Sequence, residues 1–339
     1  MWPEPGTDSF HDNRDRNYFN VSGTWFWNVS PEFINELRYS WVRRCAPNSN
    51  GSDGLDWPKR LGLTGTNERF FPIIRVTGLA VMGRDNGRNQ CPIAQNMIQH
   101  TMTKVRGKHT LKWGWEYRAS ENKDIFYGSA GGDFEFNPQA TNDALASLLL
   151  GWTNRAFRED TLPLITHADT YGAFVQTDWK VSQRLTLNLG LRWDMDQPRH
   201  EIANNRQNSF DRGLLNPVCN CPGAVRFSGR DGVSRYAHNF DKNNFGPRLG
   251  FALQLTPKTV LRGGGAVVYI GQYDQATPIV ANLGFSVRGE FVSPDAGRTA
   301  AFLLRDGLPP IKLPAEADLT SSFGAVRPGQ PVTTAVGLL

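Results

Sequence analysis

The stretch RLTLNLGLRWD, from Arg184 to Asp194, alternates between apolar and polar residues without an exception. Its odd-numbered positions hold leucines and a tryptophan, and its even-numbered positions hold polar residues and a glycine. Successive side chains of a β-strand point to opposite faces, whereas a helix would spread these leucines around all its sides. The stretch therefore predicts a strand with one apolar face. The question is whether that face meets a protein core or lipid.

The same alternation recurs in HTLKWGWEYRA (109–119), FGPRLGFALQL (245–255) and ELRYSWVR (36–43). Short turns rich in Pro, Gly, Ser and Lys connect such stretches in pairs, as is typical of hairpins. We expect four hairpins, namely 19–29 with 34–43, 92–105 with 110–119, 169–179 with 184–195, and 244–255 with 259–270. The pattern has exceptions, because 92–105 alternates weakly, Phe26 and Phe174 fall on the polar phase, and Thr177 falls on the apolar one.

Long polar segments rich in Gly, Asn and Pro separate the hairpins, at 44–91, 120–168 and 196–243. Because long segments and short turns alternate strictly, all short turns are expected at one end of the strands and all long loops at the other. Residues 71–79 are expected to add a short strand within the first loop. Residues 1–17 are expected to be a loop or leader segment, 18–270 the four hairpins, and 271–339 an irregular loop region.

Composition and motifs exclude several classes of protein. The net charge is +5, but the basic residues are scattered, which argues against a nucleic-acid partner. No apolar run approaches the roughly 20 residues of a membrane helix, and the first ten residues lack the basic and apolar regions of a signal peptide. No nucleophile, zinc or phosphate-loop motif occurs, and Gly263–Gly265 suit strand curvature better than a phosphate loop. We expect no enzyme, no cofactor and no metal site.

Three features favour lipid over a protein core on the apolar side. The strands run to about 10 to 12 residues, against a usual mode of about 5 to 6 in soluble proteins, and a tilted membrane strand needs about 9 to 11. The lopsided loops match short periplasmic turns and long extracellular loops. Aromatic residues gather near both ends of the apolar face, at Trp27, Trp179, Tyr39, Trp41, Tyr117 and Trp193.

The predicted fold is therefore all-β, an antiparallel transmembrane β-barrel that is partial and has long extracellular loops. A secreted β-sandwich explains the alternation equally well, but it explains the long strands and lopsided loops poorly. The candidates for lipid contact are Trp113, Trp115, Leu187, Leu189, Leu191 and Phe251.

The polar phase is expected to face the barrel lumen, with Arg118, Arg192, Asp194, Arg248 and Arg262 as candidates. Two interpretations stay open. These side chains contact a plug or a passing ligand, or they form a structural ladder of charges within the wall. Ligand selection is expected in the long loops, which the sequence does not decode.

The four cysteines all fall in loop-like segments and form no C-x-x-C pair, which excludes a zinc ribbon. Cys45 is a candidate to pair with Cys91, and Cys219 and Cys221 are either a linked pair or two free thiols. A disulfide would fit an oxidising compartment outside the cytosol. Four unpaired thiols remain the alternative.

The segment YGAFVQTDWKVSQRLTLNLGLRWD (171–194) resembles a segment of TonB-dependent outer-membrane receptors, in particular their Oar-like branch. RGKHTLKWGWEYR (106–118), NNFGPRLGFALQLTPKTVLRGGGAVVY (243–269) and SPEFINELRYSW (30–41) resemble further pieces of that barrel in the same order. The resemblance covers roughly 18–270. Each piece is weak alone, but four in order are fairly specific.

This resemblance implies a barrel of about 22 strands, plugged by an N-terminal domain. It also implies contact with outer-membrane lipid, an unknown small ligand, and energy from the TonB complex through N-terminal parts that this chain does not show. We expect a fragment of such a receptor. The alternative is a passive porin or adhesin barrel of about eight strands, which would need a closing strand within 271–339.

Overall fold

The computed structural model describes residues 12–13, 16–47, 49–50, 53–83, 88–236, 239–270 and 284–323. Its largest element, which we call the long sheet, is antiparallel and has the strand order β17-β16-β12-β11-β7-β6-β3-β2. Short β13 (His200–Glu201) pairs with β11 beside this path. The long strands are β2 (Asn17–Ser30), β3 (Phe33–Pro47), β6 (Arg88–Arg106), β7 (His109–Phe126), β11 (Leu164–Lys180), β12 (Leu185–Asp196), β16 (Asp241–Thr256) and β17 (Thr259–Ala266).

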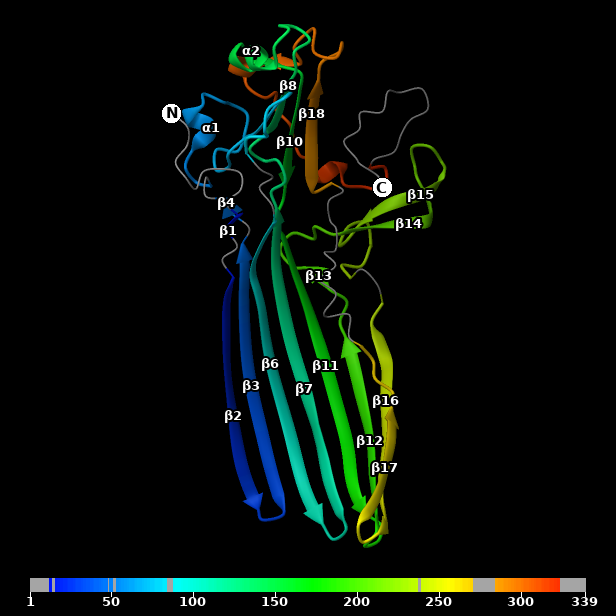
Figure 1. Ribbon diagram of the computed structural model, residues 1–339. Helices are drawn as coiled ribbons and strands as arrows, with labels where there is room; N and C mark the ends of the chain where they lie inside the picture. The colour runs from blue at the N-terminus through cyan, green and yellow to red at the C-terminus, as the bar shows by residue number, and fades with distance from the viewer. Residues whose placement is uncertain are drawn as a thin grey trace.

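The four predicted hairpins are confirmed, as β2–β3, β6–β7, β11–β12 and β16–β17. Their turns lie together at the lower end of the long sheet in Figure 1, and the long connections lie at the other end. Several strands are longer than the sequence predicted, and β6 reaches 19 residues. The alternation of 92–105 is weak, but this segment still forms a regular strand, because β6 pairs with β7.

The long sheet is open. Among the described residues, neither β2 nor β17 has a strand on its outer edge, so the barrel is partial. In the part of the chain that the structure describes, no second sheet packs on a face of the long sheet. The remaining strands stand beyond the ends of the long strands, as Figure 1 shows, which does not fit a β-sandwich.

A second sheet, which we call the cap sheet, forms from the long connections. It has the order β18-β10-β8-β5, with β5 (Ile73–Val76) parallel to β8 (Asp133–Phe136), and β10 (Arg155–Thr161) antiparallel to both β8 and β18 (Ser286–Val292). The short strand expected within 71–79 is confirmed as β5.

The sequence predicted no regular structure in 120–168 or in 271–339, yet β8, β10 and β18 lie there. These strands have only four to seven residues. Their partners are far away in the chain, as in the pairing of Arg155 with Val292. A short strand that depends on a distant partner leaves little periodicity within its own sequence, so the pattern did not reveal it.

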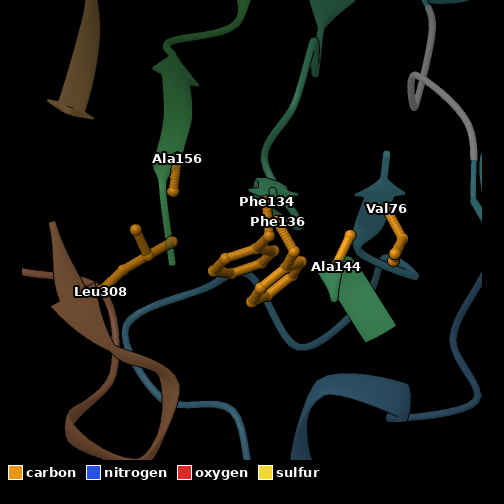
Figure 2. Close-up of a cluster of buried hydrophobic side chains, with 6 residues drawn as sticks. All are labelled: Val76, Phe134, Phe136, Ala144, Ala156 and Leu308. Carbon is orange, nitrogen blue, oxygen red and sulfur yellow. The ribbon is translucent and has the colours of Figure 1, made fainter. Parts of the chain in front are cut away.

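One face of the cap sheet carries a hydrophobic core. Val76, Phe134, Phe136, Ala144, Ala156 and Leu308 are buried together there, as Figure 2 shows. Ala144 belongs to helix α2 (Ala144–Leu149), the segment ALASLL. Asp143 caps the start of this helix, and its Oδ1 accepts hydrogen bonds from the backbone N–H groups of Leu145 and Ala146 at 2.7 and 3.1 Å. This cap satisfies amide groups that have no partner in the first helical turn.

The other elements are short. A hairpin of β14 (Asn208–Leu215) and β15 (Pro222–Phe227) contributes to a smaller core of Val225, Phe227, Phe285 and Leu319. The rest are β1 (Asp12–Asn13), β4 (Ser49–Asn50), α1 (Trp57–Arg60), β9 (Trp152–Thr153), β19 (Phe302–Leu303), η2 (Leu304–Asp306) and η3 (Glu316–Asp318).

Two disulfides are present. One joins Cys45 at the end of β3 to Cys91 in β6, across 46 positions of sequence, and it closes the first long connection. The other joins Cys219 to Cys221 in the turn between β14 and β15.

Candidate functional site

Strand register divides the long sheet into two faces. Trp113 of β7 lies opposite Val175 of β11, which in turn lies opposite Leu191 of β12. One position along, Lys112 lies opposite Gln176, and Gln176 lies opposite Gly190. Since neighbouring positions in a strand point to opposite sides, the register keeps the apolar and polar phases of these strands on separate faces.

The six candidates for lipid contact all share the apolar face. Many large side chains on this face remain exposed to the surroundings of the chain, among them Leu249 at 61%, Trp115 at 43% and Leu191 at 43%. An apolar surface of this extent on a folded protein marks contact with another protein or with a membrane. No helix within the described parts of the chain has both the length and the apolar character needed to cross a membrane.

Aromatic side chains on this face lie near both ends of the strands. Close to the short turns, the ring of Trp179 stacks on His109 with a centroid separation of 5.4 Å. Near the long connections, Trp193 Nε1 donates to the carbonyl of Lys242 at 2.7 Å, and the hydroxyl of Tyr117 donates to Asp169 Oδ1 at 2.8 Å. Rings with a polar group at one edge suit the boundary between lipid and water.

The five charged candidates share the opposite, polar face, and some of them form ion pairs. Arg192 Nε lies 2.9 Å from both carboxylate oxygens of Asp194, its neighbour two positions along β12. Arg118 Nη2 lies 2.9 Å from Glu116 Oε1 in the same way on β7. For these residues the geometry matches the expected ladder of charges within the wall.

Glycine makes room for the Arg192–Asp194 pair. Gly172 of β11 lies directly opposite Asp194. A Cβ atom at Gly172 would lie 2.7 Å from Arg192 Nη2 and 3.1 Å from Asp194 Oδ1, which is too close for the pair to keep its position. The pair therefore lies flat across the backbone of the neighbouring strand.

Glycine also accounts for Phe174, which interrupts the polar phase. Phe174 lies opposite Gly114 of β7, and its ring covers that glycine, because a Cβ added there would be 3.0 Å from Phe174 Cε1. An aromatic ring that packs over a cross-strand glycine shields backbone that has no side chain of its own. Nothing in the structure explains Phe26 on this face.

Two hollows open on the polar face. The outer hollow, at the end of the strands that carries the long connections, has a volume of about 610 Å³, and its charged lining consists of Arg118, Arg192, Arg248, Glu116, Asp194, Asp196 and Asp241. The inner hollow, nearer the short turns, has about 360 Å³ and is lined by Glu36, Arg38, Gln99, Thr101, Lys112, Phe174, Gln176, Arg192 and Arg248. Arg192 and Arg248 line both hollows. Arg262 lines neither.

The sequence did not single out Lys112, Arg38 or Gln176 as site residues. A signal was present for Lys112, which shares the polar phase with Arg118 in HTLKWGWEYRA. The contribution of Arg38 and Gln176 depends on which strands are neighbours, and alternation within a single strand does not contain that information.

Polar residues also gather beside the long connections. His167 Nε2 lies 3.0 Å from Asp169 Oδ1, and the rings of His167 and His200 are 5.8 Å apart. Burial lowers the pKa of His200, and the positive charge of Arg235 lowers it further. Among the described residues, no group of three or more His, Cys, Asp or Glu side chains is arranged to hold a metal ion.

Comparison with known proteins identifies the class of protein that has this arrangement. An open antiparallel sheet of long strands, with one apolar and one polar face, is the wall of a membrane β-barrel. Residues 2–336 match the family described as outer membrane beta barrel domain. The chain belongs to that family, and its place is the outer membrane.

A comparison with curated protein sequences finds no match. Among solved structures, the chain is similar to one described as "Copper transporter OprC", with 15% sequence identity and a TM-score of 0.33. The match covers 74% of this chain and 29% of that one, so the chain spans less than a third of the length of OprC.

Proposed function

We propose that the chain forms part of the wall of a TonB-dependent outer-membrane receptor of the Oar-like branch, which takes up a small ligand. Energy would come from the TonB complex through N-terminal parts of the whole receptor. The resemblance in 171–194 supports this proposal, because that segment forms most of one hairpin of the long sheet, β11–β12, including its turn. The resembling segments 106–118 and 243–269 lie on either side of this hairpin. The first lies mainly on β7, which pairs with β11, and the second lies mainly on β16 and β17, of which β16 pairs with β12.

The observation that carries the proposal is the separation of the apolar and charged candidates onto two faces of the long sheet. The six apolar candidates point to one side, where lipid would lie. The five charged candidates point to the other, where the lumen would lie. A charge on the lipid side of a barrel destabilises it by roughly 2–4 kcal/mol at the bilayer midplane, whereas the lumen side tolerates charge.

Two neighbouring substitutions test this assignment in the chain folded into lipid. Leu189→Arg is expected to lower the free energy of unfolding by roughly 2–4 kcal/mol. Asn188→Arg, one residue away on the other face, is expected to change it much less. Equal losses in the two variants, measured by denaturant titration in vesicles, would contradict the lipid side proposed here.

Receptor identity needs a separate test, because a passive barrel would have the same two faces. The genomic DNA on both sides of this reading frame should be sequenced. A receptor gene would encode a plug domain with a TonB box upstream and further alternating strands downstream. Unrelated genes on both sides would contradict the receptor and leave a small passive barrel.

A further inference from the structure

We infer that the inner hollow binds a small ligand through more than one anionic group, of carboxylate or phosphate type. The inference rests on the proposed function, which turns the polar face towards the lumen. It goes beyond that function, because it names the chemical class of the ligand and the part of the lumen that would bind it.

The side chains that would hold the ligand lie in one register row. Lys112 of β7 is opposite Gln176 of β11, Gln176 is opposite Gly190 of β12, and Gly190 is opposite Arg248 of β16. Gly190 contributes no side chain, and a Cβ atom added there would lie 3.2 Å from Gln176 Cβ and 3.7 Å from Arg248 Cβ, so the two side chains flank it closely. The row therefore presents one cation at each end and an amide between them.

Spacing argues for more than one anionic group. Lys112 and Arg248 are three strands apart, which places their backbones roughly 14 Å from each other at the usual strand separation. Their long side chains can both reach into the hollow, but they approach it from opposite sides. A ligand with two or three anionic groups would engage both cations, and a single carboxylate would engage one.

The cations of this row also differ from the other cations that line the inner hollow. Two other cations line the inner hollow, but each has a carboxylate partner, since Arg38 pairs with Glu36 and Arg192 pairs with Asp194. Within the described ranges, Lys112 and Arg248 make no side-chain hydrogen bond or ion pair. Four cations and one carboxylate line the inner hollow, so its balance is positive.

The outer hollow has the opposite balance, because three arginines face four carboxylates there. Charge of one sign along a cleft raises the local concentration of the complementary ion. An anion that enters from the side of the cap sheet is therefore expected to settle in the inner hollow. Arg192 and Arg248 line both hollows and offer a continuous contact between them.

A neutral sugar fits the inner hollow less well. Sugar sites present aromatic faces for stacking, and Phe174 is the one aromatic residue among those that line this hollow. Its ring is already engaged, because it packs over Gly114. The chemistry that remains is cationic and amide donors, which recognise carboxylate and phosphate oxygens.

The test uses the full chain folded in detergent micelles and isothermal titration calorimetry at low salt. Pyrophosphate and tricarballylate serve as probes with several anionic groups, and acetate serves as the probe with one. Both larger probes are expected to bind, more weakly as salt is added, and acetate is expected not to. Lys112→Gln combined with Arg248→Gln is expected to weaken their binding at least tenfold.

A matched control removes the same charge elsewhere. Lys180→Gln combined with Arg184→Gln takes two cations away near a short turn, outside both hollows, and is expected to leave binding within twofold of the original chain. All variants are first checked for folding by their migration on an unheated gel. An equal loss in both double variants, no binding by the original chain, or acetate binding as tight as that of pyrophosphate would overturn the inference.

The outcome can be separated from that of the proposed function. If the probes do not bind but Leu189→Arg destabilises far more than Asn188→Arg, only the anionic ligand is ruled out. If those two arginine variants behave alike, the lumen side is wrong, and both proposals are contradicted.

Discussion

The long sheet and the cap region, by which we mean the cap sheet together with α2 and the core that they share, bury their hydrophobic side chains in different ways. Among the described residues, the buried hydrophobic side chains lie in the long connections or in the segment after β17, and Ala168 of β11 is the exception. The long sheet instead exposes leucines and tryptophans along one face. The cap region is thus built like a water-soluble domain around its own core, whereas the long sheet depends on lipid to cover its apolar side.

This comparison predicts that core substitutions act differently in the two regions. Phe136 is 0% exposed, and Phe136→Ala is expected to destabilise the cap region by about 3–5 kcal/mol, because it leaves a cavity among fixed neighbours. Leu249→Ala on the lipid side is expected to have less than half that effect, because fluid lipid fills the space. Unfolding titrations that follow each region by hydrogen exchange measure both, and equal losses would contradict two modes of burial.

The two disulfides sharpen the comparison further. In the chain-entropy account, a bridge across 46 positions stabilises by roughly 4 kcal/mol and a bridge across 2 positions by less than about 2 kcal/mol. Cys45→Ser combined with Cys91→Ser is therefore expected to loosen the first long connection substantially. Cys219→Ser combined with Cys221→Ser serves as the matched control. Limited proteolysis of folded protein reports the difference, and faster cleavage of the control would contradict it.

A smaller effect is expected at the start of α2. Asp143→Ala removes the side chain that accepts from the backbone of Leu145 and Ala146, and it is expected to destabilise the cap region by about 1 kcal/mol. Asp143→Asn keeps an acceptor oxygen and is expected to recover most of that loss. The long sheet should unfold unchanged in both variants. An effect on the long sheet as large as that on the cap region would show that the two regions are coupled.

The smallest effect concerns pH. Because burial lowers the pKa of His200, the unfolded chain takes up a proton more readily than the folded one. The contribution of neutral His200 to the free energy of unfolding is therefore fully present above about pH 6.5, the usual pKa of histidine. It is lost as the pH falls through the lowered pKa of the folded chain. Unfolding of the segment around β13 should become easier on acidification. His200→Gln should flatten that dependence, and an unchanged slope would contradict it.

The long sheet was predictable because its information is local. Alternation in 184–194 defines both faces of β12 without reference to any partner, and the short turns define the hairpins. The six apolar and five charged candidates followed from the same parity, and the register keeps each set on one face.

The cap sheet and the hollows were not predictable in this way. The pairing of β18 with β10 joins residues more than 120 positions apart, and the periodicity within either strand does not predict this pairing. Likewise, the inner hollow depends on Lys112, Gln176 and Arg248 meeting in one row, which requires the order of the strands as well as their phases. In the sequence, Phe174 only interrupts the polar phase of its strand. The structure supplies the reason, because its ring packs over Gly114 of the neighbouring strand.

The most direct test of the account asks which face meets lipid. A nitroxide label is attached to a cysteine introduced by Leu189→Cys or by Asn188→Cys, and the label's collision rates with oxygen and with a water-soluble nickel chelate are measured in vesicles by electron paramagnetic resonance. Oxygen concentrates in the bilayer and the chelate stays in water. The account predicts that the label at 189 collides mainly with oxygen and the label at 188 mainly with the chelate. The same collision pattern at both positions, or the reverse, would contradict it.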